Sequence, residues 1–99
     1  MKVNAKSVHF SADKKLIEFI EKRLSKLEQF YDRIIEANVV LKLENSGQVR
    51  DKVAEVRLSI PGNVFYVKEV NKSFEAAVDG ATAALKRQLL KSKQRMQSR

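Results

Sequence analysis

The chain contains no cysteine and no tryptophan, and it has only one histidine, one proline and three glycines among its 99 residues. Without cysteine it can form no disulfide scaffold, no thiolate zinc site and no cysteine nucleophile. Gly47, Gly62 and Gly80 are isolated, so no glycine-rich loop is present that could cradle a phosphate. No apolar run approaches the roughly 20 residues of a bilayer-spanning helix. The first residues lack the apolar stretch of a signal peptide, so we expect a cytoplasmic protein without membrane contact.

Catalytic and metal-binding patterns are missing as well. The single histidine, His9, lies in a predicted strand without partners at the spacings that catalysis or metal binding requires. Several acidic residues share one face of a predicted helix, where basic neighbours favour a solvated surface over a catalytic pair: Glu18, Glu21, Glu28 and Asp32. We therefore expect a protein that is not an enzyme and uses no cofactor, no metal ion and no small-molecule substrate.

The length and the apolar content indicate one small domain. Compact domains typically number about 100–150 residues, so two cores do not fit in this chain. Leu, Ile, Val and Phe supply 30 of the 99 residues, too many for an intrinsically disordered chain. We expect residues 1–99 to form a single domain, with residues from about 94 to 99 as a frayed basic tail.

Hydrophobic periodicity predicts six elements in the order β-α-β-β-β-α. The first strand changes phase between Val3 and Val8, which indicates a bulge. Ser11 and Ser73 are typical helix N-caps, and Pro61–Asn63 is typical of a short hairpin turn. The predicted strands cover about residues 2–10, 37–44 and 54–60, and a fourth strand begins at 64. One predicted helix covers about residues 12–30, and the second begins at 74. A loop is predicted at 45–51.

Each predicted helix carries one apolar stripe, which must be buried against another element. The first stripe is Leu16, Ile20, Leu24, Leu27 and Tyr31, and the second is Phe74, Ala77, Val78, Ala81, Leu85 and Leu89. Two such helices and four strands favour an α+β fold, a two-layer sandwich in which both helices pack on one face of a four-stranded sheet.

The charge of the chain is strongly positive and unevenly distributed. Twenty Lys and Arg against twelve Asp and Glu give a net charge of +8 and an isoelectric point near 9.9, and polyanions are the natural partners of such a chain. Residues 71–99 hold seven of the cations and only two acids, and no acid follows residue 79. This asymmetry indicates a binding surface or a disordered tail.

A helical wheel separates the charges of both helices into faces. For the first helix, the alternative is a solvated surface with ion pairs such as Glu18–Lys22. For the second helix, the alternative is that cations near its C-terminal end stabilise the helix dipole, but one or two cations are enough for that effect. We interpret the excess as a phosphate-binding surface, in which two cationic helix faces about 10 Å apart straddle a groove of folded RNA. These cations are Lys15, Lys22, Arg23, Lys26 and Arg33 on the first helix, and Lys86, Arg87, Lys91 and Lys93 on the second.

Gly80 lies on the same side of the last helix as Arg87 and Lys91. It is either a tolerated helical glycine, which we favour, or a bare backbone position that lets a phosphate approach closely.

The element order and four segments together resemble the ribosome hibernation-promoting factors, a family that also includes ribosome-associated inhibitors and sigma-54 modulation proteins. The segments are Arg23–Ile34 (RLSKLEQFYDRI), Val39–Lys42 (VVLK), Ala77–Gly80 (AVDG) and Leu85–Lys93 (LKRQLLKSK). The resemblance covers essentially the whole chain and implies a fold similar to double-stranded-RNA-binding domains. It also implies binding to the small ribosomal subunit, in the channel of the mRNA and of the A- and P-site tRNAs, which inhibits translation and preserves idle ribosomes during stress or stationary phase.

The resemblance also implies which residues contact rRNA. In the family these contacts come largely from basic residues of the two helices, which carries over to Arg23, Lys26, Lys86, Arg87, Lys91 and Lys93, while the wheel adds Lys15, Lys22 and Arg33. Long family members carry a second, C-terminal domain that dimerises ribosomes. These 99 residues lack it, so we expect that ribosome dimers would need another factor.

Two other functions fit the same basic surface. A basic helix face can dock on an acidic protein surface, as in a regulator of a sigma factor. It can also bind structured RNA in general, outside the ribosome.

Overall fold

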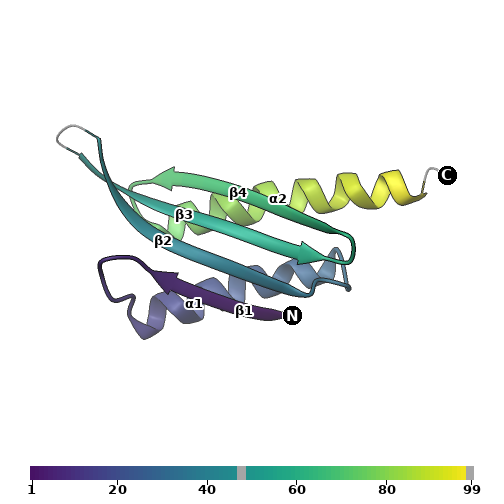
Figure 1. The fold of residues 1–99 in the computed structure, drawn as a ribbon, viewed down its shortest axis with the longest axis horizontal. Helices are drawn as coiled ribbons and strands as arrows, with labels where there is room; N and C mark the ends of the chain where they lie inside the picture. The colour runs from purple at the N-terminus through teal and green to yellow at the C-terminus, as the bar shows by residue number, and fades with distance from the viewer. Residues whose placement is uncertain (47–48, 98–99) are drawn as a thin grey trace.

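A four-stranded sheet with two helices over one face makes up the protein (Figure 1). A computed structural model describes residues 1–46 and 49–97. The elements follow the predicted order β-α-β-β-β-α, which confirms the predicted α+β sandwich. They are β1 (Lys2–Ser7), α1 (Lys14–Ser25), the 3-10 turn η1 (Lys26–Gln29), β2 (Glu36–Ser46), β3 (Val49–Ile60), β4 (Asn63–Asn71) and α2 (Phe74–Gln97).

The strands lie in the spatial order β1-β2-β3-β4. β1 pairs parallel with β2, and β2, β3 and β4 form an antiparallel meander. Because side chains alternate between the two faces, residues in register share a face. Val39, Val56 and Val67 lie side by side on three neighbouring strands and are buried under the helices.

The helices bury the stripes that periodicity predicts. Leu24 of α1 and Leu85 of α2 are both fully buried in one core with the inner sheet face. Leu16, Tyr31 and Phe74, at the ends of the predicted stripes, are partly buried against that core. The other buried stripe residues are Ile20 and Leu27, and Ala77, Val78, Ala81 and Leu89.

The prediction of a bulged strand over residues 2–10 is wrong. β1 ends at Ser7, and His9 has a φ of 65°, a left-handed conformation that turns the chain away from the sheet. The turn brings Phe10 back to the core, where its ring stacks on Phe74 with 5.0 Å between centroids. The change in hydrophobic alternation between Val3 and Val8 therefore reflects a turn after the strand. His9 is exposed, in agreement with its lack of partners in the sequence.

The start and the end of the first helix also differ from the prediction. Asp13, not Ser11, is the N-cap, because its Oδ1 accepts a hydrogen bond from the backbone N–H of Leu16 at 2.8 Å. The α-helix ends at Ser25 and tightens into η1, where the carbonyl of Leu27 accepts from the N–H groups of both Phe30 and Tyr31. This tight turn keeps Leu27 buried and begins the path into β2.

The predicted loop at 45–51 is mostly strand. The pairing of β2 with β3 continues through Glu44 and Asp51 to Ser46 and Val49. Once two long strands are aligned, ladder hydrogen bonds override the turn preference of individual residues. Residues 47–48 of the predicted turn lie outside the described residues. The turn predicted at Pro61–Asn63 is confirmed at Pro61 and Gly62, with Gly62 at a φ of 80°, while Asn63 already begins β4.

The last helix begins where the sequence predicts. The Ser73 hydroxyl oxygen accepts a hydrogen bond from the N–H of Ala76 at 3.1 Å, which confirms the predicted cap. α2 continues to Gln97, and its last turns project beyond the turn between β3 and β4 (Figure 1). The fraying expected from about residue 94 stays a prediction, and residues 98–99 lie outside the described part of the chain.

Replacing Asp13 with alanine should lower the free energy of unfolding by about 1 kcal/mol, because the Leu16 N–H loses its acceptor. Ser11→Ala is the matched control and should stay within about 0.5 kcal/mol of the parent, since Ser11 is exposed and precedes the cap. Denaturant unfolding followed by circular dichroism measures both. A larger loss for Ser11→Ala than for Asp13→Ala would contradict this assignment of the cap.

Candidate nucleic-acid interface

A groove runs between the facing sides of α1 and α2, which contact each other on the sheet. It encloses about 280 Å³. Arg23 of α1 and Lys26 of η1 line one wall, and Asp79, Thr82 and Lys86 of α2 line the other. These positions on α2 are three or four residues apart, so they form one side of the helix, next to its buried stripe. We call this feature the inter-helix groove.

Arg23 crosses the groove. Its Nε lies 3.2 Å from the Asp79 Oδ1, and its guanidinium carbon lies 4.8 Å from the centre of the Phe19 ring, one helical turn earlier. Both partners of the ion pair are about half exposed, so the pair contributes little stability, about 0–1 kcal/mol. Its main effect is to hold the long Arg23 side chain in one orientation, at the end of the groove nearest the N-terminus of α2.

Lys86 is positioned by an aromatic ring. Its Nζ lies 4.4 Å from the centre of the Phe30 ring, which follows η1. Such a cation–π contact contributes about 0.5–1 kcal/mol at an exposed site and leaves the ammonium N–H groups able to donate to another group. Lys86 and Lys26 have no carboxylate partner among the described residues, so each wall of the groove carries one unpaired cation.

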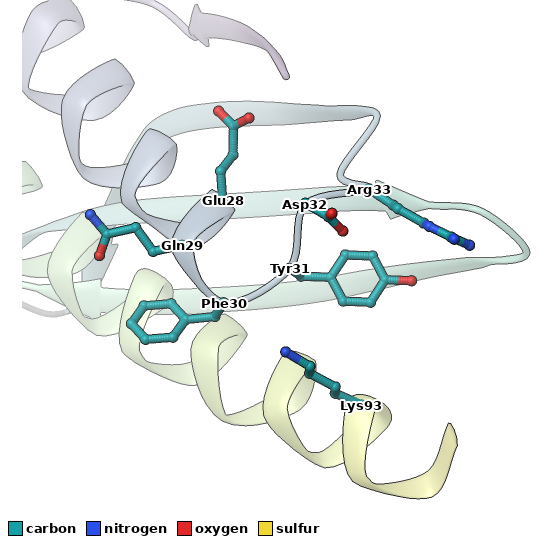
Figure 2. Close-up of a pocket in the computed structure, with 7 residues that line it drawn as sticks. All are labelled: Glu28, Gln29, Phe30, Tyr31, Asp32, Arg33 and Lys93. Atoms are coloured by element: carbon teal, nitrogen blue, oxygen red, sulfur yellow. The ribbon is translucent and has the colours of Figure 1, made fainter. Parts of the chain in front are cut away.

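A second cavity continues the groove toward the C-terminal end of α2 (Figure 2). It encloses about 460 Å³ and shares Gln29 and Phe30 with the groove. The segment that follows η1 contributes Tyr31, Asp32 and Arg33, and α2 contributes Lys93. We call it the Tyr31 cavity.

The structure brings together five of the nine basic residues predicted from the sequence. Three line the inter-helix groove and two line the Tyr31 cavity: Arg23, Lys26 and Lys86, and Arg33 and Lys93. Lys15 lines a separate hollow of about 370 Å³ beside Phe19 and Glu75, and Lys22 is exposed on α1.

Arg87 and Lys91 lie on the other flank of α2. They are exposed, and helical spacing places them on the same side as Gly80, which faces Glu69 of β4. The two flanks are therefore separated by the width of the helix. Arg87 and Lys91 would meet a different part of a nucleic acid than the cations of the groove.

The sequence prediction missed the partners of these cations. Phe30, Tyr31 and Asp79 are as much part of the groove and cavity as the basic residues are. The spacing of Phe19 and Arg23, four residues apart on a helix, was a usable signal for one contact. The approach of Lys86 to Phe30 joins residues far apart in the sequence, so only the packing of the helices reveals it.

Gly80 makes room for an acidic side chain. A Cβ at this position would lie 3.1 Å from the Glu69 Oε2 and 3.2 Å from its Cδ. A carboxylate in that space repels a phosphate, which favours the interpretation of Gly80 as a tolerated helical glycine; its role toward RNA stays a prediction. Its absent side chain instead lets α2 pack close to β4.

The opposite face of the sheet has cross-strand charge pairs. Glu55 forms an ion pair with Lys42 and accepts a hydrogen bond from the Tyr66 hydroxyl at 3.0 Å, while Lys68 pairs with Glu44 at 3.2 Å. The hydrogen-bonded ammonium of Lys42 lowers the pKa of the Glu55 carboxyl below its ordinary value. Lys42 and Lys68 are thus paired with carboxylates, unlike Lys26 and Lys86 of the groove, which have none among the described residues.

No three His, Asp or Glu side chains among the described residues gather closely enough to hold a metal ion. No helix within residues 1–46 and 49–97 has the length and apolar character needed to cross a membrane.

Comparison with known sequences identifies close relatives. The family model described as Sigma 54 modulation protein / S30EA ribosomal protein matches residues 3–97. The ribosome hibernation promoting factor of Pseudomonas putida is 31% identical over 98 residues, which cover 99% of this chain and 92% of that protein. The one from Escherichia coli K12 is 31% identical and is covered to 97%, as is this chain. A ribosome hibernation promotion factor of Deinococcus radiodurans is 36% identical over 80 residues, but the match spans only 41% of its length and 79% of this chain.

Solved structures show the same fold. The N-terminal domain of Thermus thermophilus Protein Y superposes with a TM-score of 0.79 at 26% identity, covering 92% of this chain and 98% of that one. A ribosomal subunit interface protein from Coxiella burnetii superposes with a TM-score of 0.82 at 19% identity, covering 94% and 98%.

Gly80→Ala should raise the free energy of unfolding by about 0.5–1 kcal/mol, because alanine favours the helix and the flexible Glu69 carboxylate can turn aside. RNA binding should be unchanged, since no phosphate is expected at Gly80. Ala83→Gly, at an exposed position of the same helix, is the reverse control for stability alone, because Ala83 lines the inter-helix groove, and it should lose about 1 kcal/mol. Thermal unfolding and RNA titration decide; weaker RNA binding by a stabilised Gly80→Ala variant would support the close-approach interpretation.

Proposed function

Because the chain belongs to the Sigma 54 modulation protein / S30EA ribosomal protein family and has the role of a ribosome hibernation factor, we propose that it acts by laying its two helices on RNA of the small ribosomal subunit. The proposed location is the channel of the mRNA and of the A- and P-site tRNAs. There the protein occupies the space of the translating ligands, which inhibits translation and preserves the idle subunit. A ribosome-associated family of this kind implies work in the cytoplasm.

The inter-helix groove is the observation that carries the proposal. Lys26 and Lys86 lie on opposite walls of it without carboxylate partners among the described residues, and Arg33 and Lys93 extend this positive charge into the Tyr31 cavity. Phosphate oxygens are the acceptors that such a row of donors prefers. Contacts of this kind fix position and orientation on RNA but do not read sequence, which suits a protein that recognises one folded surface.

The aromatic residues of the groove support the same function. Phe19 and Phe30 hold Arg23 and Lys86 in place before any partner arrives. Side chains that are already ordered lose less conformational entropy on binding than free lysines do. Arg87 and Lys91, on the far flank of α2, are proposed to contact a second stretch of the RNA backbone.

Inhibition by this route requires no catalysed reaction, because a protein bound in the channel competes with the mRNA and tRNAs for the same space by mass action. The same binding supplies no bridge to another ribosome. We therefore propose that ribosome dimers formed in the presence of this domain depend on another factor.

Reversing two charges in the groove, Lys26→Glu with Lys86→Glu, should weaken small-subunit binding by at least about a hundredfold, since each lost charge-assisted hydrogen bond is worth about 1.5–3 kcal/mol. The control, Lys2→Glu with Lys6→Glu, changes the net charge equally on exposed positions of β1. It should keep most of the binding, because net charge acts mainly through long-range steering. Co-sedimentation with purified small subunits measures the binding, and inhibition of cell-free translation should follow it.

Equal losses in both variants would show that bulk charge, not the groove, drives the association. Binding to free duplex RNA that matches binding to subunits would favour a general RNA-binding protein. If neither variant loses subunit binding and the protein instead captures an acidic protein, a protein-binding regulator would be favoured.

Affinity for the small subunit should depend steeply on salt. With six to ten phosphate contacts, the association constant should fall by about 10³–10⁵ between 50 and 200 mM salt, because condensed counterions are released on binding. The Lys26→Glu, Lys86→Glu variant should show a shallower slope in the same titration. A flat dependence for the parent protein would be incompatible with a phosphate-binding groove.

A further inference from the structure

The Tyr31 cavity contains more than a phosphate site requires. Phe30 and Tyr31 supply two aromatic rings that point away from each other, Arg33 and Lys93 supply two cations, and Glu28 and Asp32 add carboxylates (Figure 2). Its volume of about 460 Å³ lies within the range of small-ligand sites, about 300–1,000 Å³. Simple electrostatic attachment to RNA needs only the cations.

One polar group of this cavity is used by the fold, since Glu28 also lines it and pairs with the N-terminal ammonium of Met1 at 3.3 Å, but three others are not. Arg33 and Lys93 are exposed and form no ion pair with the described residues, and the Tyr31 hydroxyl has no hydrogen-bond partner among them. Figure 2 shows Tyr31 and Arg33 extending the same way from the segment after η1, while Lys93 points from α2 toward the aromatic residues. Packing against the core partly explains why Tyr31 lies here, but it does not explain the presence of Arg33 and Lys93.

We propose that the Tyr31 cavity receives one unstacked nucleotide of a structured RNA, with the base against Tyr31 and the phosphate bound by Arg33. The inference rests on the proposed function, since it names what the RNA places at the end of the groove. Proteins commonly hold splayed-out RNA bases on aromatic side chains and bind their edges with polar groups. The Asp32 carboxylate accepts hydrogen bonds from base amino groups and disfavours a bare phosphate deeper in the cavity.

Continuity with the groove identifies the source of the nucleotide. The cavity and the groove share Gln29 and Phe30, so an RNA backbone held by Lys26 and Lys86 passes directly to the cavity mouth. A free nucleotide has the same chemistry but lacks the contacts in the groove. The RNA-borne nucleotide is therefore favoured, and the free one is a separate arm of the test.

The chain itself offers a specific probe. It has no tryptophan and only two tyrosines, Tyr31 and Tyr66, and the second lies on the opposite face of the sheet, so Tyr66→Phe leaves Tyr31 as the only tyrosine. Two RNA hairpins serve as ligands, with the same stem, one fully paired and one with a single bulged adenosine. The bulged hairpin should bind about tenfold more tightly, a gain typical of one base stacked on an aromatic ring, and should quench Tyr31 fluorescence more than the paired hairpin does.

Three variants complete the experiment. Tyr31→Leu should bind both hairpins equally, with the affinity of the parent for the paired one. Tyr31→Phe leaves only Tyr66 emission, which should not respond to the bulge, while the ring keeps most of the preference. Arg33→Gln should lower affinity for the bulged hairpin by about tenfold, and its exposed position keeps it informative if Tyr31→Leu fails to fold.

The outcomes separate this inference from the proposed function. A parent protein that co-sediments with small subunits but does not distinguish the hairpins overturns the nucleotide site and leaves the function standing. A preference for the bulge without co-sedimentation rejects the function and retains the site. Quenching by adenosine monophosphate alone, with no preference for the bulged hairpin, would show that the cavity takes a free nucleotide and overturn its assignment to RNA.

Discussion

The burial of two single-stripe helices on one face of one sheet is the constraint on which the rest of the structure depends. Leu24 and Leu85 enter the same core from different helices, and the inner sheet face between β2 and β4 supplies the floor. Small residues of α2 at Ala77 and Ala81 let that helix approach closely. With both helices on one side, their free flanks must face each other. The inter-helix groove is thus a by-product of core formation, and function is added by the side chains on its rim.

Charge is arranged differently on the two faces of the sheet. On the outer face, Lys42 and Lys68 are satisfied by carboxylates on neighbouring strands. On the helix side, aromatic rings lie beside two cations, Phe19 beside Arg23 and Phe30 beside Lys86. A ring orients a cation without cancelling its charge, whereas a carboxylate does both. Asp79 is the exception in the groove, and it pairs with the one cation, Arg23, that lies nearest the N-terminal end of α2.

Periodicity predicted most of the fold because burial on one face is a local property of a helix or strand. The stripes around Leu24 and Leu85 and the Ser73 cap follow directly from spacing and residue type. The failures occur where a distant partner decides. Phe10 turns inward to meet Phe74, and Asn45 pairs with Arg50 because the ladder before them is already aligned. Only helix packing could divide the predicted cations between groove, cavity and outer flank.

The parallel pairing of β1 with β2 has a kinetic consequence. It joins Asn4 to Asn38, 34 positions apart, whereas the meander of β2, β3 and β4 closes through short connections. Loop-closure entropy and contact order make the meander the earlier event and the docking of β1 the later one. The first helix lies between these two strands in the chain, so we expect its basic side to meet α2 together with the docking of β1. Competence for RNA therefore arises late in folding, and a partly folded chain lacks one wall of the groove.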